Sequence, residues 1–114
     1  SYPPVYPPTS FQVTGASVSV SPSYNTCGTD SFTFTGTITA NAAGTVRYNW
    51  ERSDGGWTPE ETIYFGSAGT QTVTNVWSLN SDYSGWQRLR ILAPNDTSSN
   101  MATFSHTSNC LWYY

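Results

Sequence analysis

The chain has 114 residues, enough for one domain with a single core, because a chain of this length buries roughly two thirds of the surface that its unfolded form exposes. Its charged side chains are four Arg and seven Asp or Glu, with no Lys, and the net charge is -3. This balance argues against nucleic acid and against anionic membrane surfaces as partners, since both require clustered cationic side chains. Apolar runs are short, so we expect no membrane insertion. The first residues do not resemble a signal peptide, and we interpret the chain as a mature or excised segment.

Residues 1–10 contain a doubled Tyr-Pro-Pro unit. Its four prolines fix φ and remove four backbone donors, which predicts an extended polyproline II segment rather than a central strand. One interpretation is a tether to a preceding domain or anchor. The other is an aromatic extension that docks on a neighbouring copy through Tyr2, Val5, Tyr6 and Phe11. The sequence leaves both open.

From residue 11 onward, β-branched and aromatic residues dominate and apolar residues recur at every second position, which predicts strands and no helices. Turn signals separate seven such segments: residues 17–21, 31–39, 45–51, 62–65, 71–79, 87–93 and 101–107. Seven strands with turns every 8 to 14 residues, roughly, favour an all-β, antiparallel Greek-key sandwich.

Segment 45–51 is the predicted centre of this sandwich. Its two parities are Val46, Tyr48 and Trp50, which are apolar or aromatic, and Arg47, Asn49 and Glu51, which are polar. Such alternation predicts one buried and one solvated face. The third and sixth strands of such a sandwich pair, so we expect Glu51 beside Arg88 or Arg90.

The later segments carry further expectations. Asn75 shares the inward parity of segment 71–79, so it must be hydrogen-bonded, at a bulge or less buried than its neighbours. Residues 80–85 are interpreted as a polar loop, and residues 94–96, Pro-Asn-Asp, as a hairpin turn. His106 falls on the inward parity of the last strand.

The two cysteines, Cys27 and Cys110, stand near opposite ends of the predicted domain, with no Cys or His at metal-binding spacing. A disulfide is the leading interpretation, with two free buried thiols as the alternative. Closing a loop of about 84 residues would stabilise the fold by roughly 4 to 5 kcal/mol through the unfolded chain. A disulfide implies an oxidising compartment, so the expected location is extracellular or the cell surface.

Catalysis finds little support in the residue types. The lone histidine, His106, is best interpreted as structural, since nucleophilic catalysis needs a base beside its nucleophile. Glu60 and Glu61 are adjacent and would point to opposite sides of an extended chain, which does not suit a glycosidase pair. The acidic residues are too scattered for a calcium loop, and no phosphate-binding or zinc motif is present. We therefore expect no enzyme activity, cofactor or metal.

Aromatic content is the one excess, with five Trp, eight Tyr and five Phe. About half fit the predicted core, and the others lie at ends and turns, where exposed aromatic surface marks contact sites. One hypothesis is self-association through Tyr2, Val5, Tyr6, Phe11, Trp112, Tyr113 and Tyr114. A head-to-tail contact of this kind does not close and builds filaments. The alternative is sugar stacking on Trp57, Tyr83 and Trp86.

Glycosylation signals are weak. Asn95-Asp96-Thr97 is a sequon on a predicted turn, and Asn25-Thr26-Cys27 has the rarer Asn-X-Cys form. Numerous Ser and Thr residues would also permit O-glycosylation, which would help a sparsely charged surface to stay soluble.

Four stretches carry a family resemblance: Phe-Thr-Phe-Thr-Gly-Thr-Ile-Thr-Ala (32–40), Gly-Thr-Val-Arg-Tyr-Asn-Trp-Glu-Arg-Ser-Asp-Gly (44–55), Gly-Thr-Gln-Thr-Val-Thr (69–74) and Gly-Trp-Gln-Arg-Leu-Arg-Ile-Leu-Ala-Pro-Asn (85–95). Residues 18–110, about four fifths of the chain, resemble the bacterial immunoglobulin-like or fibronectin-III-like modules of secreted and cell-surface proteins. The resemblance implies an immunoglobulin-like sandwich and no catalytic residues.

The expected organisation is a Pro/Tyr-rich extension at 1–10, an immunoglobulin-like sandwich at 11–110 and an aromatic tail at 111–114. The function expected from it is a non-catalytic structural or adhesive module that assembles into a surface fibre through its aromatic ends, and the alternative is a carbohydrate-binding module. Its partners would be other copies or neighbouring domains, with a glycan in the alternative.

Overall fold

The computed structural model describes residues 10–23 and 30–107, and these form antiparallel β-strands with no helix among them. Eight strands are present where the sequence predicted seven. They are β1 (Val13–Ser21), β2 (Ser31–Ala40), β3 (Gly44–Arg52), β4 (Glu61–Phe65), β5 (Gly69–Ser78), β6 (Tyr83–Ala93), β7 (Thr97–Ser98) and β8 (Ala102–His106). The expected all-β, antiparallel class is confirmed.

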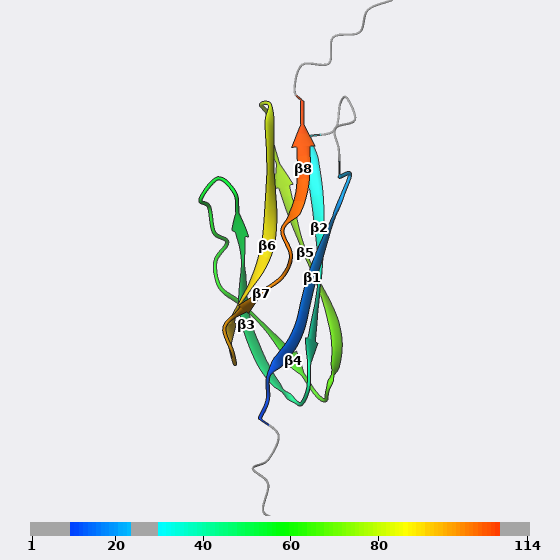
Figure 1. Cartoon of the computed structure of the whole chain (residues 1–114), viewed down its shortest axis with the longest axis vertical. Helices are drawn as coiled ribbons and strands as arrows, with labels where there is room; N and C mark the ends of the chain where they lie inside the picture. The colour runs from blue at the N-terminus through cyan, green and yellow to red at the C-terminus, as the bar shows by residue number, and fades with distance from the viewer. Residues whose placement is uncertain (1–9, 24–29, 108–114) are drawn as a thin grey trace, which may run out of the picture.

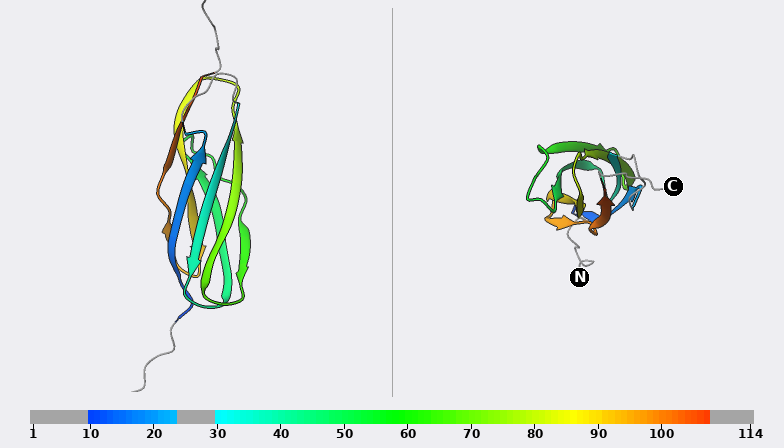
Figure 2. Two further views of the ribbon diagram at one scale, coloured as in Figure 1. Left: turned by 90° about the vertical axis from the view of Figure 1, so that its right-hand side faces the viewer. Right: turned by 90° about the horizontal axis from the view of Figure 1, so that it is seen from above.

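The strands form two sheets that face each other (Figures 1 and 2). One has three strands in the order β1-β2-β5, and the other has five, in which β4, β3 and β6 follow one another and β6 pairs with both β7 and β8. The two short strands share the long edge of β6: β7 pairs at Arg90 and Ile91, and β8 pairs over Tyr83 to Gln87. β1 begins at one end of the long axis and β8 ends at the other (Figure 1).

The core lies between the sheets and follows the predicted alternation. On β3, Val46 and Trp50 are fully buried and Tyr48 nearly so. The indole of Trp50 packs over Gly36 of the facing sheet, where a Cβ atom would lie 3.1 Å from Trp50 Cη2 and 2.5 Å from Leu89 Cδ1. Gly36 therefore leaves the space that the largest core side chain fills.

The chain between β5 and β6 differs from the prediction. Residues 83–85 belong to β6, so the interpretation of 80–85 as a loop is wrong for its second half. They form a strand because they pair with β8, at Tyr83 with His106 and at Gly85 with Phe104. Asn75 is half-buried, as one of the three expectations for it allowed.

Candidate functional site

Charge divides the molecule into two faces. None of the eleven charged residues, four Arg and seven Asp or Glu, lies on β1, β2 or β5. We call the outward side of this sheet the hydroxyl face; its residues are Ser17, Ser19, Ser21, Ser31, Thr33, Thr35, Thr37, Thr39, Thr70, Thr72, Thr74 and Ser78, with Val76 among them. Cross-strand hydroxyl bonds join Ser17 to Thr37 at 2.6 Å and Thr39 to Thr70 at 2.8 Å.

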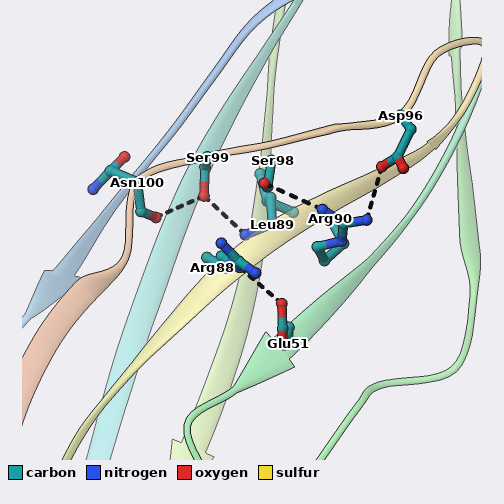
Figure 3. A network of polar contacts seen from close by, with 8 residues as sticks. All are labelled: Glu51, Arg88, Leu89, Arg90, Asp96, Ser98, Ser99 and Asn100. Carbon is teal, nitrogen blue, oxygen red and sulfur yellow. Dashed lines mark hydrogen bonds and ion pairs between the residues drawn. The ribbon is translucent and has the colours of Figure 1, made fainter.

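The outward side of the five-stranded sheet carries ion pairs instead. Glu51 lies directly opposite Arg88, and Arg88 Nε donates to Glu51 Oε1 at 2.8 Å, which confirms the predicted pairing (Figure 3). Arg90 donates to Asp96 Oδ1 at 2.7 Å and to Ser98 Oγ at 3.2 Å. These contacts connect β3, β6 and the turn before β7.

The other two arginines are also paired. Arg47 and Glu60 meet at 2.6 Å, and Arg52 and Asp54 at 2.7 Å. The hydrogen bond from Arg47 holds the pKa of Glu60 below its usual value, outweighing desolvation, and the charge of Arg47 adds to it. Burial raises the pKa of Asp54, but hydrogen bonds from Gly56 and Arg52, with the Arg52 charge, outweigh burial and leave that pKa lowered. All four guanidinium groups are thus engaged within the chain, which leaves this face poorly suited to an anionic ligand.

Trp57 and Trp86, two of the predicted sugar-stacking residues, lie on this ion-paired face. Trp57 is 54% exposed and bridges to Glu51, so their side chains share one side of the sheet. The Arg88 guanidinium lies over the Trp86 ring, 5.5 Å from its centroid. The two tryptophans therefore flank the Glu51–Arg88 pair.

Tyr83 does not join them. It has the inward parity of β6, and its ring packs against Trp77 and Phe104 at centroid distances of 5.5 and 6.1 Å. Its hydroxyl is 2.5 Å from Ser53 Oγ. The structure thus presents two of the three predicted aromatic residues on one face and uses the third for packing.

Asn95, the predicted sequon residue, has a structural contact. Its Oδ1 accepts from Val13 N at 2.8 Å and its Nδ2 donates to Val13 O at 3.0 Å. Asn100 makes the same two hydrogen bonds with Val18: its Oδ1 accepts from Val18 N and its Nδ2 donates to Val18 O, each at 2.9 Å. Each carboxamide replaces a neighbouring strand along the edge of β1 and so ties the three-stranded sheet to β7. Glycosylation of Asn95 would place a sugar on the nitrogen that bonds Val13.

Phe11 packs against the core and covers Gly44, where any Cβ atom would collide with its ring. This contact within its own chain is what the structure shows for Phe11, and its role in self-association stays a prediction. The remaining residues of that hypothesis, Tyr2, Val5, Tyr6, Trp112, Tyr113 and Tyr114, lie outside the described residues, as do Cys27 and Cys110 of the predicted disulfide.

His106 is 2% exposed, as its inward parity predicted. Its Nδ1 lies 2.6 Å from Ser81 O and its Nε2 lies 3.3 Å from Asp30 Oδ1. In residues 10–23 and 30–107 there is no pocket and no group of three His, Cys, Asp or Glu that could hold a metal ion. No helix in the described part of the chain is long and apolar enough to cross a membrane.

Gln87 is a buried polar residue that sequence reasoning missed. It is fully buried between the sheets, and neither polar atom of its amide has a partner among the described residues. Trp50 Nε1 is buried without a partner as well. The signal was available, since Gln87 shares the inward parity of Leu89 and Ile91.

No family model matches the chain, and no curated protein matches it. Among solved structures, the X-ray structure of a Northeast Structural Genomics Consortium target is similar to it, with 13% identity over 91% of each chain and a TM-score of 0.42. A likeness at this level carries no conclusion about function.

Proposed function

We propose that the chain is a non-catalytic structural or adhesive module, extracellular or on a cell surface, whose copies associate head to tail through their aromatic ends. One observation carries the proposal: β1 begins at one end of the long axis and β8 ends at the other (Figure 1). The chain therefore enters the sandwich at one end of the long axis and leaves it at the other, the arrangement that a linear array of modules requires.

We infer that the sandwich is of the immunoglobulin-like Greek-key type. The strand order supports this, because the chain changes sheet from β2 to β3, from β4 to β5 and from β5 to β6. β7 and β8 both pair with β6 and are separated only by residues 99–101, so together they take the place of one seventh strand. Trp50 on the third strand occupies the centre of the core, as in immunoglobulin domains.

Three features favour a structural role over catalysis. Every arginine is held by an acidic side chain of the same chain. The one histidine is buried beside a backbone carbonyl. The described residues also form no pocket in which a substrate could be enclosed.

Self-association is tested by light scattering and negative-stain imaging of the full chain and of a variant lacking residues 1–9. Ser10 is kept because its carbonyl accepts from Asn41 Nδ2 at 3.0 Å. We expect filaments or large oligomers from the full chain and their loss from the variant. A matched deletion of residues 111–114 tests the aromatic tail in the same way. A full chain that stays monomeric at high concentration contradicts the proposal.

The second candidate, carbohydrate binding, is favoured by the common face of Trp57 and Trp86. Flat aromatic rings on one face could stack against sugar rings. Retention on insoluble polysaccharides should fall for Trp57→Ala and Trp86→Ala but not for Tyr64→Ala, an aromatic residue 65% exposed on the same face. Equal retention of all four proteins would contradict this function.

The expected location depends on the Cys27–Cys110 disulfide. Mass measurement after alkylation, with and without prior reduction, should show no free thiol until the protein is reduced. Two alkylated cysteines without reduction would remove the argument for an oxidising compartment.

A further inference from the structure

The edges of the two sheets differ in how they are protected. An edge strand exposes unpaired N–H and C=O groups, and proteins commonly cover or interrupt such edges to prevent pairing with another chain. Three of the four sheet edges, those formed by β1, by β4 and by β7 with β8, are covered, short or interrupted. The fourth, β5, is not.

The edge of β1 is covered by Asn95 and Asn100, whose carboxamides take both the N–H and the C=O of Val13 and Val18. Its ladder is also irregular between Val13 and Gly15. In the other sheet, β4 has only five residues and follows Pro59 and Glu60. At the opposite edge, β7 and β8 are two short pieces interrupted at residues 99–101.

β5 is ten residues long and pairs with β2 without a register shift, from Gly69 opposite Ala40 to Ser78 opposite Ser31. It contains no proline and no charge. Two side-chain contacts lie beside it, Gln71 Nε2 donating to Tyr64 O at 2.7 Å and the Arg52 guanidinium 4.4 Å from the Trp77 ring centroid. Among the described residues, no group outside β2 bonds the β5 backbone. Alternate N–H and C=O groups of β5 therefore point away from the sheet unpaired.

We propose that β5 pairs with β5 of a second copy of this chain, antiparallel about a two-fold axis, so that two three-stranded sheets become one continuous six-stranded sheet. A second copy suits this edge because of where the charges lie. The chain is net negative, yet no charged residue lies on β1, β2 or β5. Pairing at this edge therefore joins the uncharged sheets of the two copies and places no like charges opposite each other.

The paired residues suit each other as well. A two-fold axis near the middle of β5 places Thr74 close to Thr74 of the partner, and Thr72 and Val76 near it on the same side. Cross-strand Thr–Thr and β-branched pairs stabilise sheets. Such a contact is isologous and closed, so it goes beyond the proposed head-to-tail contact and is independent of it.

The test introduces charge at this edge and at a matched position. Thr74 lies in one cross-strand row with Thr35 and Ser19, so Ser19→Lys places the same charge on the same face at the opposite edge. In sedimentation velocity over a concentration series, Thr74→Lys and Thr74→Glu should each lower the association constant about tenfold or more, because the two-fold axis brings like charges together. Ser19→Lys should leave it unchanged. Mixing Thr74→Lys with Thr74→Glu should restore association.

Hydrogen exchange identifies the occupant of the edge. Alternate amides of β5 should exchange more slowly in the associated state than in the dilute monomer. The variant lacking residues 1–9 should lose the head-to-tail assemblies but keep the association-dependent protection of β5, which distinguishes the two contacts. Failure of the mixture to associate, equal loss in Ser19→Lys, or a protein that is monomeric throughout would each overturn the proposal. So would protection, already in the monomer, of the β5 amides that point away from β2.

Discussion

The two outer faces of the sandwich expose different side chains to water: hydroxyl groups on one and ion pairs on the other. The hydroxyl face has twelve Ser and Thr side chains on three strands that carry no charge. The opposite face carries Arg47, Arg88 and Arg90, each held by an acidic partner, and the exposed ring of Trp57. Both faces cover the same core.

The difference also separates two kinds of contact. On the ion-paired face the arginines and acidic side chains are already committed to one another, and Arg88 lies over the Trp86 ring. The exposed ring of Trp57 is the aromatic surface left uncovered beside them. On the uncharged sheet the backbone of β5 is the feature left for a partner. For a side-by-side contact between two copies, which is separate from the head-to-tail one, the uncharged sheet is favoured because two net-negative copies repel least there.

The largest expected effect comes from the residue that joins the two sheets. Trp50→Ala should lower the free energy of unfolding by about 3–5 kcal/mol, because it leaves a cavity against Gly36 and Leu89. Trp57→Ala removes the same kind of side chain from the solvated side of the same sheet. It should change the free energy of unfolding by less than about 0.5 kcal/mol. Urea unfolding of both variants checks the pair, and similar losses would contradict the assignment of inward and outward sides.

The next effect concerns the link between the sheets. Asn100→Ala leaves the N–H and C=O of Val18 without their partner and should cost about 1–2 kcal/mol. Asn95→Ala should act similarly at Val13. Asn80→Ala, at an exposed loop position, is the control and should cost less than about 0.5 kcal/mol. Thermal or urea unfolding measures the difference, and equal values for Asn80 and Asn100 would show that the edge of β1 does not need its covering carboxamides.

A smaller effect separates the ion pairs by their exposure. The Arg88–Glu51 side chains are 24% and 19% exposed, against 52% and 41% for Arg47–Glu60. Glu51→Gln should therefore cost about 1 kcal/mol, the upper end for pairs near a surface, and Glu60→Gln should cost less. High salt should weaken the second pair more than the first. Unfolding in low and high salt tests the order, and a reversed order would contradict it.

The smallest expected effect is the decrease in the free energy of unfolding at acidic pH. Because the pKa values of Glu60 and Asp54 are lowered in the folded chain, their contribution to stability is fully present above the ordinary pKa of a carboxyl group, about 4. It is lost as the pH falls through the lowered values. Unfolding at a series of acidic pH values should show this decline, with a shallower slope in Glu60→Gln. An unchanged slope would assign the dependence to other groups.

Local patterns predicted much of the fold. The alternation in residues 45–51 identified both sides of β3. Pairing the third and sixth segments placed Glu51 beside Arg88 or Arg90, and the structure has it opposite Arg88. The same parity rule predicted the inward His106. In each case the determining signal lies within a few residues, because a strand with one buried face must repeat every second residue.

The candidate site depended on distant contacts. The predicted sugar-stacking set is Trp57, Tyr83 and Trp86, and Tyr83 instead packs inward. Its neighbours Asn80 to Ser84 look like a loop unless β8 is beside them. Asn95 was interpreted as a turn and a sequon, and its bond to Val13 joins residues 82 positions apart. No pattern within residues 94–96 identifies that partner.

The sequence by itself determined the class of the fold, the inward and outward sides of the strands it delimited, and the scarcity of charge, because these follow from composition and from a two-residue period. Only the tertiary structure decided that the charges on strands all belong to one sheet, that two asparagines cover the edge of β1 and that the edge of β5 is left open. These features depend on which strands become neighbours, and strand pairing is set by contacts between residues far apart in the chain.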